Sequence, residues 1–201
     1  MRALGKRGPG IFPKRFRPLL GREEDVGMWP SFVAWVGRAS AADLTAAYEA
    51  DRNVHVRGLI CRRVGDRGLR EETPMLVHAL RRPSAQERHA AADSLGKFGD
   101  PGAAPDFWAR FEVEEDPRVR EMLLMGLAAT GGRRIVPTLI ERLGDGAPCG
   151  PRAHSAWALR VLGTVEALPS LRNALADEPD GWTRGVIREA IEELERVNPQ
   201  A

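Results

Sequence analysis

An arginine recurs along this chain at a nearly constant spacing, and this periodicity limits the fold more than any other feature of the sequence. Successive members are separated by 31, 32, 32 and 32 residues. The five positions are Arg57, Arg88, Arg120, Arg152 and Arg184. A regular interval of this length is typical of proteins built from stacked structural repeats.

Three further columns keep the same register as the arginines. An aliphatic residue follows each arginine by seven positions, and the first four arginines are followed by a glycine at eleven positions and a proline at seventeen. The glycines are Gly68, Gly99, Gly131 and Gly163, and the prolines are Pro74, Pro105, Pro137 and Pro169. Four columns in one register predict about five repeats of about 32 residues.

Each repeat is predicted to contain two antiparallel helices. The glycines fall where a helix would end in a left-handed cap, and apolar residues on both sides follow a helical period. Strand formers are scarce, with one Tyr and six Thr against 27 Ala, which favours helix over sheet. Apolar pairs four residues apart mark the first helix: Leu44/Tyr48, Leu76/Leu80, Phe107/Phe111, Leu139/Leu143 and Leu171/Leu175. No repeat can bury such a stripe alone, so the sequence predicts an all-α solenoid.

The second helix of each pair is expected to begin just before the arginine. Asn53, Asp116 and Asp180 are suited to cap the start of a helix, and Pro117 fits a first turn. Residues 84–87 (SAQE) have the sequence of a capping box, in which the serine and the glutamate each bind a backbone N–H of the other.

Two segments resemble a known family. Residues 116–121 (DPRVRE) followed by 126–131 (GLAATG), and residues 152–163 followed by 166–171 (EALPSL), are similar to HEAT-like repeats of the short, bilin-lyase type. The resemblance covers about residues 41–196. It implies that each recurring arginine joins a preceding aspartate in a structural ladder between neighbouring repeats, with both members kept only at Asp116/Arg120 and Asp180/Arg184.

The segments outside the array have other compositions. Residues 1–22 carry seven cations and no acid, together with several Gly and Pro, which predicts a basic disordered arm. Such an arm suits nucleic-acid phosphates, an anionic surface or an acidic protein partner, or is simply a solvated tail. Residues 23–40 are expected to hold an N-terminal capping helix at about 28–36, residues 41–196 the repeat array, and residues 197–201 a tail.

Several classes of protein and of site are not indicated. No run approaches the roughly 18 apolar residues of a membrane span, and the first thirty residues lack a signal peptide, so we expect a cytoplasmic protein. Cys61 and Cys149 stand 88 residues apart without metal-ligand spacing. We therefore expect no metal and no cofactor.

A helical wheel predicts which residues of the second helices form the inner surface of the solenoid. Positions one, five and nine after each arginine lie opposite the core. This surface runs from mixed charge through an apolar centre around Trp157 to an acidic end. The predicted binding residues are Arg62, His89, Asp93, Met125, Trp157, Val161 and Glu189.

Three residues of that surface are weak candidates for catalysis. His89 and Asp93 are four residues apart, and Glu121 is the equivalent of His89 in the next repeat. A histidine oriented by a carboxylate is typical of general acid–base chemistry, although the same spacing also suits an ordinary surface pair. His55, His78 and His154 are not expected to join this group.

Three classes of function follow. The apolar-centred surface favours a non-enzymatic scaffold or adaptor that binds a protein or peptide. The first alternative is a nucleic-acid-binding or DNA-glycosylase-like HEAT-repeat protein, although Arg62 and Lys97 are the only fixed cations predicted on the inner surface. The second alternative, from the resemblance to bilin-attachment lyases, is a lyase or isomerase that acts on a small molecule.

Overall fold

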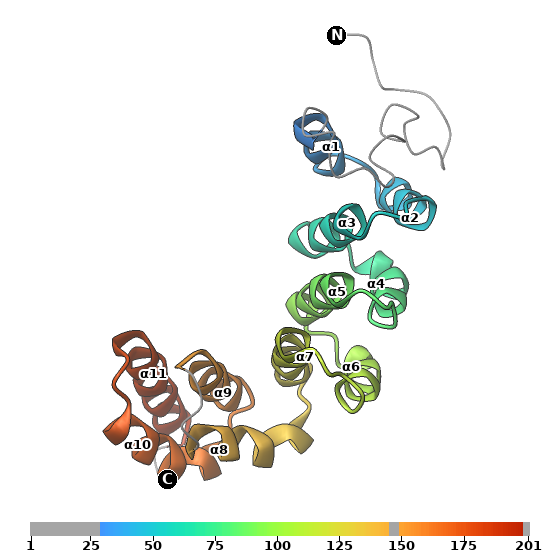
Figure 1. The fold of residues 1–201 in the computed structure, drawn as a ribbon. Coiled ribbons are helices and arrows are strands. Elements are labelled where there is room, and N and C mark those ends of the chain that lie inside the picture. Colours follow the sequence, from blue (N-terminus) through green and yellow to red (C-terminus); the bar gives the residue numbers. More distant parts are fainter. Residues whose placement is uncertain (1–28, 145–148, 199–201) are drawn as a thin grey trace. The chain divides into compact units, whose positions relative to one another are not determined.

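The computed structural model describes residues 29–144 and 149–198, and every element within these ranges is helical. An N-terminal helix is followed by five helix pairs (Figure 1). They are α1 (Trp29–Val36), α2 (Ala41–Ala50), α3 (Val54–Asp66), α4 (Thr73–Ala79), α5 (Ala85–Phe98), α6 (Ala104–Phe111), α7 (Pro117–Ala129), α8 (Val136–Gly144), α9 (Cys149–Val161), α10 (Leu168–Asp177) and α11 (Gly181–Val197). The predicted all-α solenoid of five two-helix repeats is confirmed. The arm predicted at 1–22 lies outside the described residues, as do residues 199–201 of the predicted tail.

The recurring arginine is the fourth residue of every second helix. The predicted caps explain why these helices begin where they do. Asn53 accepts a hydrogen bond from the backbone N–H of His55, Asp116 accepts from Arg118 and Val119, and Asp180 accepts from Thr183. Each carboxylate or amide oxygen thus satisfies N–H groups that have no partner inside the helix.

The capping box predicted at 84–87 forms only in part. Ser84 Oγ lies 3.5 Å from the backbone nitrogen of Glu87, but the Glu87 carboxylate does not return to the start of the helix. It is fully buried and accepts a hydrogen bond from Arg57 Nε at 2.8 Å. An ion pair with the preceding repeat has replaced the local bond.

The glycine and proline columns mark the turn between repeats. Gly68, Gly99, Gly131 and Gly163 have φ angles of 64°, 59°, 78° and 62°, in the left-handed region that favours glycine. A short 3₁₀ turn follows each glycine, and the proline is the second residue of α4, α6, α8 and α10. Proline fits there because the first N–H groups of a helix need no intrahelical acceptor.

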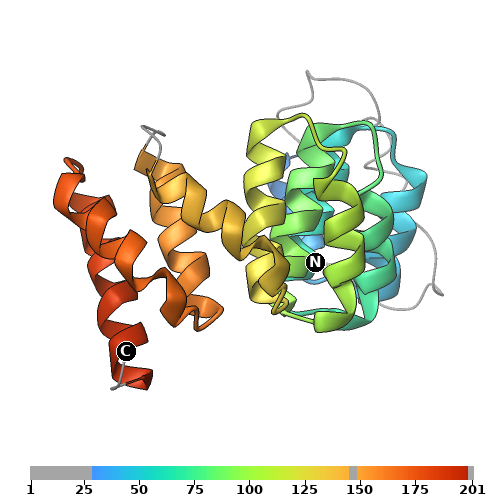
Figure 2. The ribbon, with the colours of Figure 1, turned by 90° about the horizontal axis from the view of Figure 1, so that it is seen from below.

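The chain divides into two compact units. The first contains the described residues up to Phe98 together with residues 114–119, and the second contains residues 99–113 and those from Arg120 onward. In the first unit, α3 packs against α5, α2 against α3 and α4 against α5 (Figure 1). In the second, α9 packs against α11, α8 against α9, α10 against α11, and α8 against α10; these helices are yellow-orange to red in Figure 2.

Four of the five predicted apolar pairs are buried at both positions, and in the fifth Leu171 is buried while Leu175 is half-buried. Leu44, Leu76, Phe107, Leu139 and Leu171 all have an exposed fraction of 0%. In α1, Phe32 and Val36 are equally inaccessible, and Arg67, which follows α3, donates a hydrogen bond to the carbonyl of Ala39, which follows α1, at 2.6 Å. This bond joins the segment after α1 to the first repeat, and the capping role of α1 stays a prediction.

The recurring arginines form a structural ladder, but not with the aspartates that the family resemblance implies. Arg88 Nε lies 2.7 Å from Glu114, and Arg152 Nε lies 2.6 Å from Glu178. Asp116 and Asp180, two residues further on, cap helices instead. The longer glutamate side chain can reach the arginine of the preceding repeat, while the shorter aspartate is in place to accept from the helix start.

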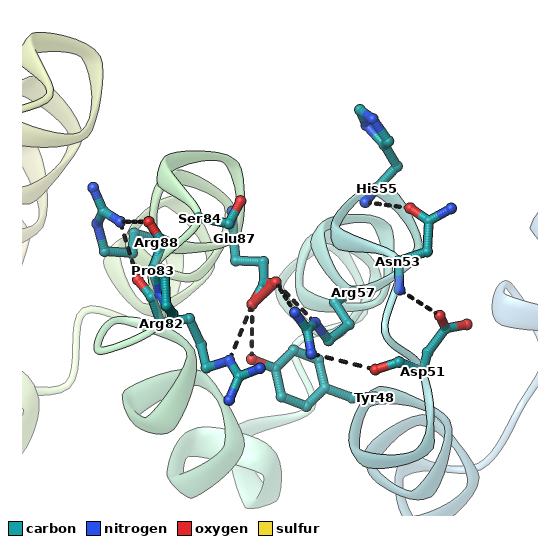
Figure 3. A network of polar contacts seen from close by, with 10 residues as sticks. All are labelled: Tyr48, Asp51, Asn53, His55, Arg57, Arg82, Pro83, Ser84, Glu87 and Arg88. Atoms are coloured by element: carbon teal, nitrogen blue, oxygen red, sulfur yellow. Dashed lines mark hydrogen bonds and ion pairs between the residues drawn. The ribbon is translucent and has the colours of Figure 1, made fainter. Parts of the chain in front are cut away.

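A similar contact joins the first two repeats (Figure 3). Arg57 reaches the buried Glu87 of the next repeat at 2.6 Å and also donates to the carbonyl of Asp51. Tyr48 and Arg82 approach the same carboxylate, each at 3.5 Å. Because these contacts join successive repeats, Arg57, Arg88 and Arg152 contribute to the stacking of the repeats.

Candidate functional site

The predicted binding residues are distributed over the second helices of both units. Arg62 lies on α3 and His89 and Asp93 lie on α5, all in the first unit. The second unit holds Met125 on α7, Trp157 and Val161 on α9, and Glu189 on α11.

The predicted acid–base pair of His89 and Asp93 is not formed. Asp93 makes an ion pair with Lys97 at 2.9 Å, and Lys97 also bonds Asp66 of α3 at 2.9 Å. The spacing of four residues that suggested a link to His89 also places Asp93 beside Lys97, whose full charge attracts the carboxylate more strongly. Asp93 is therefore part of an ion-pair cluster between α3 and α5.

His89 lies instead with Arg62 on the wall of a cavity of about 370 Å³ in the first unit. Its partial burial and the neighbouring Arg62 hold the pKa of His89 below the ordinary value, against the opposing charge of Asp93. Both effects disfavour the imidazolium ion, so His89 is neutral at pH 7.

Glu121 has a histidine partner, but it is His154. Glu121 Oε1 on α7 lies 2.9 Å from His154 Nδ1 on α9, and Arg142 of α8 bonds the other carboxylate oxygen. The expectation that His154 takes no part in such a group is wrong. A helical wheel treats each helix alone, whereas this pair forms between two neighbouring helices.

One signal in the sequence could have revealed the pair. Glu121 and His154 are 33 residues apart, close to one repeat length. Other polar pairs between neighbouring second helices have similar separations, 31 residues for Asp66 and Lys97 and 29 for Arg160 and Glu189. Complementary side chains about one repeat apart thus indicate contacts across the stack.

The surroundings of Glu121 keep its carboxylate ionised. Burial alone would raise the pKa of Glu121, but the hydrogen bond with His154 and the charge of Arg142 outweigh burial, and the pKa lies below its ordinary value. An ionised carboxylate at Nδ1 favours the tautomer that carries a proton on that nitrogen. The Nε2 atom of His154 is then available to accept a proton.

Apolar side chains continue along the helix faces that carry this pair. His154, Trp157 and Val161 are spaced by three and four residues on α9, and Met125 follows Glu121 by four residues on α7. Residues at these spacings share one face of a helix. The side chain of His154 is 40% exposed and Val161 is 45% exposed. We call these five residues the His154 surface.

Glu189 belongs to a separate ion pair. Its carboxylate is exposed and accepts a hydrogen bond from Arg160 Nη1 at 2.7 Å. Because Arg160 offsets its charge, Glu189 does not form the free acidic end that the sequence suggested.

None of the helices between residues 29 and 198 that the structure describes is long and apolar enough to cross a membrane. Within these helices and their connections, no three or more His, Cys, Asp or Glu residues are grouped to hold a metal ion.

Two known proteins are similar to this chain. The bilin biosynthesis protein PecE of Nostoc sp. strain PCC 7120 is 34% identical over 85 residues, which are 42% of this chain and 30% of that protein. The chain thus matches less than a third of the length of this relative. A chain in the solved complex of CpcE and CpcF of phycocyanin lyase from Nostoc sp. PCC7120 shares the fold, with a TM-score of 0.54 and 18% identity. The alignment covers 83% of this chain and 99% of that chain.

These relatives correct the leading functional expectation. We expected a non-enzymatic protein- or peptide-binding scaffold, whereas the similar proteins are named for bilin biosynthesis and for phycocyanin lyase. The scaffold interpretation is therefore wrong, and the second alternative agrees better with the relatives. Neither relative is named for nucleic-acid binding or repair.

The family itself follows from the repeats. The model for HEAT repeats matches residues 41–121 and 108–192, which include all five helix pairs described above except the end of the last helix. This protein belongs to the HEAT-repeat family.

Proposed function

We propose that this protein is a lyase or isomerase that acts on a small molecule of the bilin type, with His154 as the group that transfers a proton. The observation that carries the proposal is the bond between His154 and Glu121, held in place by Arg142. The names of the two relatives support the class of substrate. A bilin is an open-chain tetrapyrrole, a flat conjugated molecule.

The His154 surface has the groups that such a reaction needs. Lyases and isomerases form or move double bonds, which requires a proton to leave one atom or to reach another. His154 Nε2 would accept or donate this proton, and the Glu121 carboxylate would stabilise the imidazolium ion that forms. Arg142 keeps the carboxylate in position and ionised. A positioned general acid or base typically accelerates a reaction about 10²- to 10⁴-fold.

The apolar residues of the same surface would bind the conjugated body of the substrate. Trp157 offers an aromatic face, Val161 follows it by four residues on α9, and Met125 follows Glu121 by four residues on α7. Burying one tryptophan removes about 150–250 Å² from water, worth about 4–6 kcal/mol before the costs of ordering and desolvation. Trp157 is therefore the residue on which binding should depend most.

We extend the proposal to a protein partner. The solved relative is a complex of two different proteins, CpcE and CpcF. The present protein would likewise act together with a second protein. Its activity is therefore to be measured on protein isolated from the native host, which would retain such a partner.

Binding tests the substrate class directly. We predict that biliverdin, used as the probe bilin, changes its visible absorbance on titration with the full chain. Trp157→Ala should weaken binding at least about ten-fold, because loss of about 1.4 kcal/mol has this effect. His55→Gln, at an exposed position near the start of α3, is the matched control and should leave the affinity unchanged. An unchanged spectrum, or equal affinity in the Trp157→Ala protein, would refute the proposed substrate class.

A further inference from the structure

The cavity of the first unit brings together polar residues from three helices. Arg62 comes from α3, Gln86 and His89 come from α5, and Asp116 and Arg118 lie at the start of α7. Ala85 and Val119 complete its lining, and its volume is about 370 Å³. This volume falls within the range of small-molecule sites in proteins.

Two arginines of this cavity differ from the arginines of the ladder. Arg57 and Arg88 are bound to buried glutamates. In contrast, the side chains of Arg62 and Arg118 form no hydrogen bond or ion pair with any residue that the structure describes, and both are exposed. Two guanidinium groups that pair with no described residue thus line one cavity.

The acidic groups nearby are already engaged. Asp116 Oδ1 accepts hydrogen bonds from the backbone nitrogens of Arg118 and Val119, at 2.9 Å and 3.0 Å. Asp93 is paired with Lys97. The lining carries two arginines and one aspartate, so with His89 neutral its formal net charge is +1.

The histidine adds a neutral donor to this cationic wall. Burial and the charges of Arg62 and Arg118 lower the pKa of His89, while Asp93 and Asp116 act in the opposite direction. A neutral imidazole carries one N–H that can donate to an anion, and the amide of Gln86 carries two more.

We infer that this cavity binds the carboxylate group of a small molecule through Arg62 and Arg118, with His89 and Gln86 as further donors. Arginine matches the two oxygens of a carboxylate, and a net charge of +1 suits a monoanion better than a doubly charged phosphate. Ala85 and Val119 would contact the aliphatic part of the ligand. This site is independent of the proposed function, because it uses neither His154 nor Trp157.

The test uses the histidine of the cavity as a reporter. The chain has four histidines, so ¹³C-labelled imidazole signals can be resolved by NMR and His89 identified with the His89→Gln variant. Sodium propionate is titrated into the full chain while sodium chloride keeps the ionic strength constant. We expect a saturable shift of the His89 signal. We also expect the pKa of His89 to rise when propionate binds, because the bound anion offsets the charge of the arginines.

Substitutions assign the effect to the two arginines. Replacing both Arg62 and Arg118 by glutamine should weaken propionate binding at least about ten-fold, because two charge-assisted hydrogen-bonding groups are lost. Arg118→Gln alone should weaken it by a smaller factor. Arg52→Gln removes an exposed cation that does not line the cavity and should leave binding unchanged. Exposed arginines without ion pairs should be replaceable without loss of folding, which the melting temperature of each variant checks.

Three results would overturn the inference. The first is a His89 signal that does not shift saturably with propionate. The second is equal propionate affinity in the wild-type and doubly substituted proteins. The third is tighter binding of inorganic phosphate than of propionate, which would contradict the assignment to a carboxylate. The biliverdin titration has a separate readout, so either proposal can fail alone.

Discussion

At the scale of single residues, buried ion pairs between successive repeats distinguish this chain from a simple stack of apolar helices. The Glu178 side chain is fully inaccessible to solvent, and the Arg152 side chain is only 15% exposed. The hydrogen bond from Arg152 holds the pKa of Glu178 below its ordinary value. The carboxylate is therefore charged although its side chain has no exposed area.

Removing the arginine of this pair should destabilise the second unit strongly. Arg152→Met leaves the Glu178 charge buried without its partner, which we expect to cost about 3 kcal/mol of unfolding free energy. Arg172→Met breaks the exposed pair with Glu195, whose side chains are 52% and 43% exposed, and should cost less than about 1 kcal/mol. Urea denaturation followed by circular dichroism measures both. Equal losses in the two variants would show that burial of the ladder pair does not matter.

At the scale of helices, α3 and α5 come so close that one glycine is required. A Cβ atom added at Gly65 would lie 2.8 Å from Ser94 Cα and 2.4 Å from Ser94 Oγ. Ser94 Oγ also donates to the carbonyl of Cys61 at 2.8 Å, which fixes the two helices at this distance. At Gly58, on the same helix, an added Cβ would meet only ordinary contacts of 3.5 Å or more.

Two glycine substitutions in α3 should therefore have opposite effects. Gly65→Ala forces α3 and α5 apart and should destabilise the first unit by about 1–3 kcal/mol, as overpacking does. Gly58→Ala should stabilise it by about 0.5–1 kcal/mol, because alanine loses less backbone entropy in a helix than glycine does. Denaturation midpoints of the two variants check the prediction. It is wrong if Gly65→Ala is as stable as Gly58→Ala.

The helices themselves were predictable from the sequence because their signals are local. The glycine at each repeat end, the proline in each first turn and the caps at Asn53, Asp116 and Asp180 act within a few residues of their own positions. Contacts between helices were not predictable in the same way. Glu87 pairs with Arg57 and does not complete its capping box. Arg88 and Arg152 pair with Glu114 and Glu178 and not with the neighbouring aspartates.

The candidate site was predicted less well for the same reason. A helical wheel puts Trp157, Met125 and Val161 on the same predicted face of their helices, a placement that stays a prediction. It suggested a pair of His89 with Asp93. Lys97, on the same helix, forms an ion pair with Asp93 instead. Glu121 forms a hydrogen bond with His154, which lies about one repeat away. Side-chain pairing across the stack depends on the register between helices, which a helical wheel does not contain.

At the scale of the whole molecule, the repeats provide surfaces from which different functions can be built. Stability in such arrays comes from contacts between neighbouring repeats, so exposed residues of the second helices are free to serve binding or catalysis. The His154 surface lies in the second compact unit, and the cavity lined by Arg62 and Arg118 lies in the first. The HEAT-repeat fold alone predicts neither site. Each proposal depends on the side chains found at that site.

The measurement that tests the central proposal most directly is the rate at which biliverdin is converted by the protein isolated from its native host, followed by absorbance and mass spectrometry of the pigment. We predict that the wild-type protein converts the pigment and that His154→Gln binds it but reacts at least about 100-fold more slowly. Glu121→Gln should lower the rate less, since the imidazole remains. Conversion at the wild-type rate by His154→Gln, or no conversion by the wild-type protein, would contradict a proton-transfer role for His154.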